Sequence, residues 1–280
     1  MSKIKHPEKL LRKLEKIDNL FGFTPTIKKV IELISDENIP LNKIAKTIEK
    51  DPELTARILR LANSPFYGIP KRIATIEAAL ILLGTTTLRL LLISSLSFRI
   101  FNKNDTKFKE HSINTAFCAR CLSEKANLIN PQEMFIAGLL HDLGKIVLKT
   151  QFPKEYRKVL TLQNKGLSVC EAEKEVFKMD HAEVGSILME KWNFPQRLIE
   201  SIKAHHNLNL ANKYKKEAMI IQLADKIAHI KNEKNKFEEK LVLNSQVFAI
   251  LNISISEIKE ILKTLESHSS EAQLLIEEIS

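Results

Sequence analysis

The chain has few of the residues that interrupt regular structure or build covalent frameworks. Its 280 residues include only 7 glycines, 9 prolines and 3 cysteines. Few glycines and prolines leave long uninterrupted stretches, which is typical of helical proteins. Three cysteines are too few for a disulfide-built scaffold and favour a reducing compartment, so we expect a cytoplasmic protein.

The sequence shows little of the apolar patterning of a signal peptide or a membrane span. Its N-terminus, MSKIKHPEKLLRKLEKIDNL, is charged and amphipathic, unlike the apolar core of a signal peptide. The apolar segment AALILLGTTTLRLLLISSLSF is interrupted by Gly84 and Arg89. It therefore predicts a pair of buried helices, and we expect no membrane association.

The net charge of +9 and the pI near 9.3 could indicate an anionic partner. The basic residues are mostly lysines interspersed with glutamates. No arginine cluster or aromatic stacking set is evident, so the sequence predicts a solvated surface and no nucleic-acid-binding module.

Repeated apolar stripes at helical spacing predict an all-α fold, with an N-terminal helical subdomain packed on a C-terminal one. Asp51 before Pro52 predicts a helix start, and Gly84 a helix end. The predicted parts are an N-terminal subdomain (1–101), a polar linker (102–110), a second subdomain (111–230) and C-terminal helices (231–280). Residues 1–101 offer no evident catalytic set, and we expect them either to dock a partner protein or to pack against the second subdomain and shield its pocket.

Two polar residues, His141 and Asp142, stand inside the apolar run GLLHDLGKIV. An ionised carboxylate is costly to bury unless a partner compensates its charge. A metal ion or a hydrogen-bonded structural pair would each serve. Lys145 follows one turn after His141 and would suit either a phosphate contact or an ordinary surface position.

Helical periodicity places further polar residues on inward faces. The stripe in RLIESIKAHHN, for example, runs directly into two histidines. The inward set comprises His111, His141, Asp142, His181, His205, His206 and Asp225. Helical proteins build metal sites from such side chains, although inward histidines could also bond to one another in a purely structural scaffold. Seven ligands would suit two divalent ions bridged by a carboxylate, with Fe, Mn, Zn and Ni all compatible, and such a pair activates water for phosphoester hydrolysis.

The motifs HDLGK, HAEVG, AHHN and LADKIAH resemble the HD superfamily of metal-dependent phosphohydrolases. The segments DPELTARILRLANSPFYG, ATIEAALILLG and TTLRLLL are similar to the HDOD domain, and the resemblance covers residues 20 to 230. The superfamily pattern implies one metal held by His111, His141, Asp142 and Asp225. The pattern of the HD-GYP branch implies a second metal held by His181, His205 and His206, with Asp142 bridging and Lys145 matching that branch's lysine.

The resemblance to HDOD domains implies a regulatory protein of signal transduction that acts through a signalling protein partner. The alternative is a metal-dependent phosphohydrolase acting on a nucleotide or cyclic dinucleotide, with Asp142 and Lys145 as catalytic residues. The HD-GYP branch hydrolyses cyclic di-GMP and carries a Gly-Tyr-Pro loop after its paired histidines. Here the sequence reads HHNLNLANKYKK, so that loop is missing.

Overall fold

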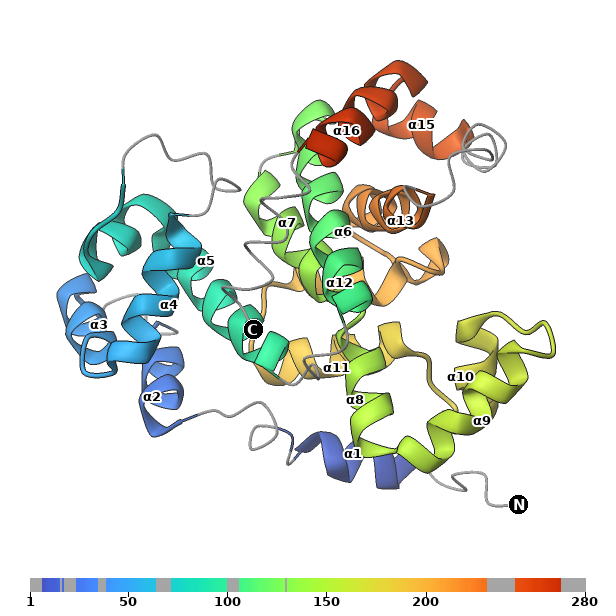
Figure 1. The fold of residues 1–280 in the computed structure, drawn as a ribbon, viewed down its shortest axis with the longest axis horizontal. Coiled ribbons are helices and arrows are strands. Elements are labelled where there is room, and N and C mark those ends of the chain that lie inside the picture. Colours follow the sequence, from blue (N-terminus) through green and yellow to red (C-terminus); the bar gives the residue numbers. More distant parts are fainter. Residues whose placement is uncertain are drawn as a thin grey trace. The chain divides into compact units, whose positions relative to one another are not determined.

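The computed structural model describes residues 7–15, 17, 24–34, 39–63, 72–99, 106–128, 130–230 and 245–267. Within these ranges the regular elements are helices, and none of the described residues forms a strand. The prediction of an all-α protein is therefore confirmed. The chain divides into two compact units, and Figure 1 labels their helices. Unit 1 comprises Met1–Ile17 and Asn114–Lys263, and unit 2 comprises Asp18–Ile113 and Thr264–Ser280.

Unit 2 is built around four helices with one apolar core. The helices are α2 (Pro25–Ile34), α3 (Leu41–Ile48), α4 (Pro52–Ala62) and α5 (Ile76–Arg99). Val30, Ile48 and Ile76, from three of these helices, are completely buried in that core. Their burial removes apolar side chains from water, which is the main favourable contribution to folding.

Two local interactions fix the ends of α4. The predicted N-cap is present, because the backbone N–H of Leu54 donates to Asp51 Oδ1 at 3.0 Å. At the other end, the Asn63 side chain accepts from the backbone N–H of Ile73 and donates to the Ile73 carbonyl, each at 2.7 Å. These two bonds attach the end of α4 to the segment that leads into α5.

The apolar segment with Gly84 forms α5, which is kinked rather than ended at that residue. Gly84 has φ 78 and ψ 160, a non-helical conformation that a glycine adopts without steric cost. The predicted helix end is thus a break between two helical stretches. No helix in the described parts of the chain is long and apolar enough to cross a membrane.

The predicted linker is partly helical, because α6 (Thr106–Lys125) includes its residues 106–110. Residues 102–105 of that linker and the charged stretch 231–244 lie outside the described residues. Helix α6 begins in unit 2 and continues into unit 1. The predicted subdomain boundaries stay predictions.

Unit 1 contains the remaining helices, except that the last four residues of α16 belong to unit 2. Their bounds are α1 (Pro7–Glu15), α7 (Pro131–Leu140), α8 (Leu143–Gln151), α9 (Pro153–Gln163), α10 (Val169–Phe177), α11 (His181–Lys191), α12 (Gln196–Ala204), η3 (Leu208–Leu210), α13 (Lys215–Ile230), α15 (Ser245–Leu251) and α16 (Ile255–Ser267). Helix α8 packs on α11, α11 on α12, α12 on α13, and α13 on α7. Since α7 leads directly into α8, these five helices close a ring of contacts.

Helix α1 belongs to unit 1, although the sequence assigned residues 1–101 to one subdomain. Leu10 and Leu14 are buried, and Lys13 Nζ donates to the Gln151 carbonyl at the end of α8, 2.6 Å away. In return, Lys191 Nζ donates to the Leu14 carbonyl at 3.2 Å. Both lysines satisfy carbonyls that have no partner within their own helix.

Helices α8 and α11 approach closely at Gly144, opposite Gly185. A Cβ added at Gly144 would collide with the carbonyl oxygen of His181, whereas one added at Gly185 would meet its nearest atom at 3.5 Å. Only the first position therefore requires glycine on steric grounds. This contact brings the start of α8, which follows Asp142, against the start of α11, which is His181.

We predict that Gly144→Ala destabilises the fold by about 1–3 kcal/mol, because the helices must separate to accept a methyl group. Gly185→Ala is the matched control on the same interface. Its methyl group fits at ordinary contact distance, and alanine favours a helix by up to about 1 kcal/mol over glycine. Chemical denaturation of both variants measures the difference, and equal stabilities would contradict this description of the interface.

Candidate metal centre

Two histidines at helix C-termini have their ring orientation set by the preceding turn. His141 follows α7, and its Nδ1 is 2.7 Å from the Gly138 carbonyl oxygen. His205 follows α12, and its Nδ1 is 2.6 Å from the Ile202 carbonyl oxygen. A carbonyl only accepts, so each Nδ1 carries a hydrogen, and in the neutral ring Nε2 is the nitrogen whose lone pair can bind a metal.

His181 reaches the same place from the start of α11. Asp180 caps this helix by accepting from the backbone N–H of Glu183 at 2.9 Å, and Glu183 returns the contact in a capping box. The cap places His181 at the first helical position, completely buried. Its ring then meets Asp142, which itself occupies the N-cap position of α8.

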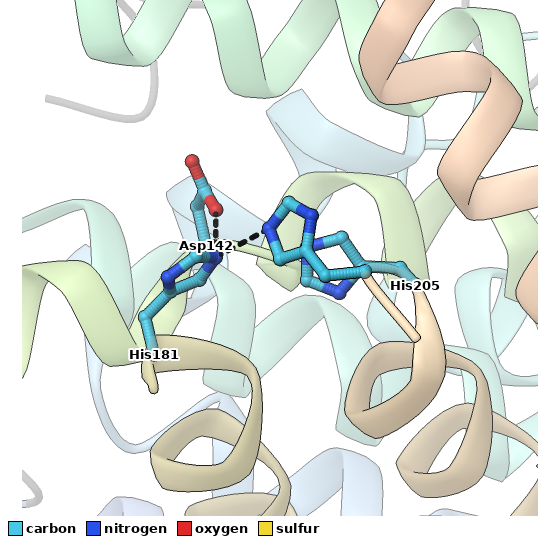
Figure 2. A group of neighbouring side chains, drawn as sticks. Asp142, His181 and His205 are labelled. Carbon is cyan, nitrogen blue, oxygen red and sulfur yellow. Dashed lines mark hydrogen bonds and ion pairs between the residues drawn. The ribbon is translucent and has the colours of Figure 1, made fainter. Parts of the chain in front are cut away.

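Side chains from four segments converge on Asp142 Oδ1 and its surroundings. Oδ1 lies 3.2 Å from His181 Nε2 and 3.4 Å from His141 Nε2. His141 Nε2 also lies 3.5 Å from Asp225 Oδ1 on α13, and His206 Nε2 lies 2.8 Å from His181 Nε2. Figure 2 shows Asp142, His181 and His205 pointing toward one another.

The potential ligand atoms fall into two overlapping groups within unit 1. One group contains Asp142, His181, His205 and His206, whose ligand atoms all lie within 4.8 Å of one another. The other contains His141, His205 and Asp225, by the same measure. The structure therefore brings together six of the seven ligands predicted from the sequence.

The seventh predicted ligand, His111, lies on the part of α6 that belongs to unit 2. Its side chain is partly buried. Its assignment to the first metal rests on the resemblance to the HD superfamily and stays a prediction.

His205 provides a direct test of whether the residues fit a metal ion. Its Nε2 is buried and has no hydrogen-bond partner, although a polar atom without a partner is costly in a protein interior. Burial, and then the charges of His141 and His181, lower the pKa of His205 to about 3. The ring is thus a neutral imidazole with a lone pair available, which is the form that binds metals. The donor set fits a cation.

Asp142 stays ionised despite its burial. Burial raises its pKa, but His141 and Lys145, together with the hydrogen bond to His181, hold the pKa well below its usual range. Lys145 Nζ lies 2.7 Å from Asp142 Oδ2. Lys145 is therefore an ion-pair partner of Asp142, rather than a solvated surface lysine.

Two residues near the centre were not singled out from the sequence. Glu173 on α10 is completely buried, and its Oε2 accepts from His181 Nδ1 at 2.6 Å. His229 lies one turn after Asp225 on α13, with 3.3 Å between His229 Nε2 and Asp225 Oδ1. The i, i+4 spacing in LADKIAH could have indicated His229, whereas no sequence spacing links Glu173 to His181.

Comparison with known proteins gives one family. A family model described as the HDOD domain matches residues 20–208, more than half of the chain. An uncharacterized protein of Treponema pallidum (strain Nichols) is 27% identical over 201 residues, which cover 69% of this chain and 39% of that protein. The chain thus spans about two fifths of the length of this relative.

Two solved structures are similar over nearly the whole chain. One, from Shewanella amazonensis SB2B and described as a candidate phosphohydrolase, is 24% identical with a TM-score of 0.74, covering 95% of this chain and 97% of its own. The other, described as an HDOD domain protein with unknown function from Geobacter sulfurreducens, is 25% identical with a TM-score of 0.67, covering 92% of each. The first likeness shows the fold alone.

We predict that a chelator lowers the melting temperature of protein purified without chelators. An ion that binds only the native state stabilises it by about 2.7 kcal/mol at 100 times its dissociation constant. Asp142→Ala should lower the melting temperature of the metal-loaded protein as well, because the other ligands lose their shared counter-charge. Thermal denaturation with and without chelator checks both points, and the chelator should have little effect on the variant. Identical curves for wild type would show that any bound metal is peripheral.

We also predict that divalent ions bind more tightly as the pH rises through neutrality. Burial and Lys145 lower the pKa of His181, but hydrogen bonds to Asp142 and Glu173 outweigh them and raise it above its ordinary value. His181 therefore holds its proton to higher pH, and an ion must displace that proton to bind. Affinity for Mn²⁺ should rise until the pH exceeds the raised pKa. Titration calorimetry in buffers of different ionisation enthalpy counts the released protons, and no proton release would refute the prediction.

Proposed function

Because the chain belongs to the HDOD domain family, we propose that it is a cytoplasmic regulatory protein of signal transduction that binds two divalent ions and acts through protein partners. The observation that carries this proposal is the enclosure of the ligands. His141, Asp142, His181, His205 and Asp225 are all buried, and only His206 among the six is exposed.

The burial of the candidate ligands favours a regulatory role over catalysis. Catalytic metal sites keep a coordination position open to water and substrate, whereas structural sites are closed by protein ligands. With five buried ligands, the centre offers access mainly beside His206. Binding or loss of ions would then stabilise or loosen the ring of helices α7, α8, α11, α12 and α13.

The candidate ligands would contribute differently to ion binding. Asp142 would supply negative charge to both ions, since its Oδ1 lies 3.4 Å from His141 Nε2 and 3.2 Å from His181 Nε2. His205 contributes to both groups of ligand atoms. Imidazole and carboxylate ligands are compatible with Fe, Mn, Zn and Ni. When bound, such ions would supply Lewis-acid activation of water.

Partner binding is assigned to unit 2. Among the described residues, none of the candidate ligands lies on helices α2 to α5. Within their described residues these helices therefore form a packed helical body without candidate ligands, which suits a binding surface. The partner is a signalling protein, in keeping with the regulatory role implied by HDOD domains.

A second candidate function is hydrolysis of a nucleotide or cyclic dinucleotide. The ion pair of Lys145 with Asp142 favours it, because it places a cation beside the candidate ligands, where a phosphate could bind. In that case Asp142 and Lys145 would be the catalytic residues. Against it, the residues after His206 form the short turn η3 and contain no Gly-Tyr-Pro sequence.

One set of measurements separates the two functions. The full chain and Asp142→Asn are purified without chelators, analysed for bound metal, and assayed with Mn²⁺, Fe²⁺, Zn²⁺ or Ni²⁺ on cyclic dinucleotides, nucleotides and generic phosphodiesters. Each protein is also used as bait for cellular partners. We expect metal on wild type only, no turnover above the variant, and a partner retained only by the metal-loaded protein.

Metal-dependent turnover that is absent from Asp142→Asn would replace the regulatory proposal by the hydrolase. Wild type without bound metal, even after incubation with each ion, would contradict both. In that case the inward histidines are a structural network.

A further inference from the structure

Glu173 is a buried acid whose hydrogen bonds in the described structure both go to His181. We propose that Glu173 is a positioning residue that fixes the tautomer and orientation of His181 and strengthens this ring as a metal ligand. The inference rests on the metal centre proposed above. Glu173 is not one of the candidate ligands, and its helix, α10, contributes none of them.

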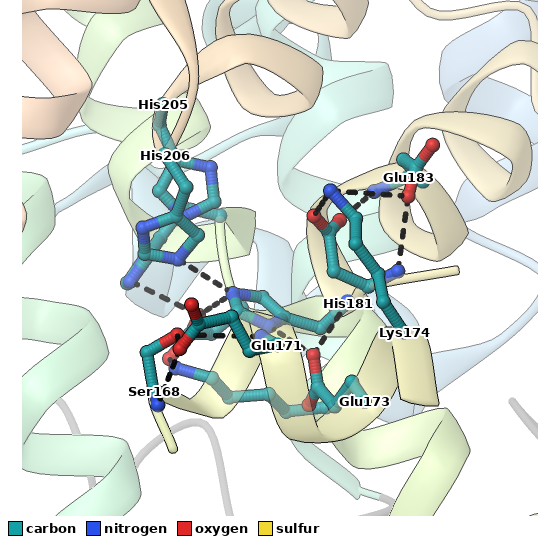
Figure 3. Close-up of polar contacts among 12 residues, drawn as sticks. Ser168, Glu171, Glu173, Lys174, His181, Glu183, His205 and His206 are labelled. Carbon is teal, nitrogen blue, oxygen red and sulfur yellow. Dashed lines mark hydrogen bonds and ion pairs between the residues drawn. The ribbon is translucent and has the colours of Figure 1, made fainter. Parts of the chain in front are cut away.

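The contact geometry is specific to His181. Glu173 Oε2 lies 2.6 Å from His181 Nδ1 and also accepts from the His181 backbone N–H at 2.8 Å. One oxygen thus holds both the backbone and the ring of the same residue. Figure 3 shows Glu173 and His206 on different sides of the His181 ring.

This contact decides which ring nitrogen faces the centre. A carboxylate can only accept, so Nδ1 carries a hydrogen, and once the ring is neutral Nε2 is the nitrogen with the lone pair. Nε2 lies 3.2 Å from Asp142 Oδ1 and 2.8 Å from His206 Nε2. Without Glu173 the ring could rotate or exchange tautomers, and Nε2 would no longer be held in place for an ion.

The Nδ1 partner of His181 is charged, unlike the Nδ1 partners of His141 and His205. The Nδ1 atoms of His141 and His205 point at neutral backbone carbonyls, whereas His181 points at a carboxylate. A carboxylate behind a ligating imidazole raises its basicity and therefore its strength as a ligand. His181 should consequently be a stronger donor than the other two rings.

The burial of Glu173 supports a role beyond stability. Its side chain is completely buried, and its second oxygen, Oε1, has no hydrogen-bond partner. A buried carboxylate with an unsatisfied oxygen is costly. An apolar residue of similar size would avoid that cost, so the acid is best explained by what it does to His181.

Two substitutions separate orientation from charge, with an exposed acid on the same helix as control. Glu173→Gln keeps an oxygen that can accept from His181 but removes the charge. Glu173→Leu removes the acceptor while keeping similar bulk. Glu175→Gln changes an exposed side chain of α10 and should behave like wild type. Each full-length protein is stripped with chelator and titrated with Mn²⁺ by calorimetry.

We expect Glu173→Leu to weaken Mn²⁺ binding by about 10–100-fold, the usual effect of losing such a partner, and Glu173→Gln to weaken it less. In the metal-free proteins, at a pH where the His181 ring is neutral, proton–nitrogen NMR of the histidine rings should show His181 protonated on Nδ1 in wild type and Glu173→Gln. In Glu173→Leu this preference should be lost. A purely structural role would change stability without changing the tautomer.

Glu173→Gln that binds Mn²⁺ as tightly as wild type would overturn the claim that the charge of Glu173 strengthens His181 as a ligand, even if Glu173→Leu fails to fold. A metal-free wild type whose neutral His181 is protonated on Nε2 would overturn the positioning role. The NMR measurement needs no metal and therefore tests Glu173 separately. Wild type that binds no Mn²⁺ while keeping the Nδ1 tautomer would contradict the metal centre and leave the positioning of His181 by Glu173 supported.

Discussion

The charge of the buried carboxylate Asp142 is the constraint on which the centre of unit 1 depends. An isolated charge in a protein interior would be neutralised by a shift of its pKa. Here Lys145, His141 and His181 surround the carboxyl and keep its pKa well below the usual range. A bound cation would add to the same compensation, so metal binding and the local fold would stabilise each other.

The neighbouring rings are placed mostly by the ends of helices. His141 and His205 follow α7 and α12, and their Nδ1 atoms donate to carbonyls of the preceding turn. His181 starts α11 behind the cap of Asp180. The ligands therefore depend on the packing of their helices, and the close approach at Gly144 joins the stability of the fold to the geometry of the centre.

The features predicted correctly from the sequence are those that local periodicity and helix capping determine. The helical fold and the Asp51 cap follow from such patterns, and so does the inward direction of the polar residues that the structure brings together. The sequence could not indicate Glu173, because its contact with His181 depends on how the chain turns between α10 and α11. The grouping of α1 with unit 1 and the crowding at Gly144 likewise arise from contacts between distant segments.

The central claim is that Asp142 and the surrounding histidines form a metal centre. The most direct measurement is a crystal structure of protein purified without chelators, with anomalous scattering recorded at the absorption edges of Fe, Mn, Zn and Ni. The account predicts an anomalous peak about 2.0–2.2 Å from Asp142 Oδ1 and from Nε2 of His181 and His205, typical ligand distances for such ions. Density without an anomalous peak, with the rings hydrogen-bonded to one another, would contradict it.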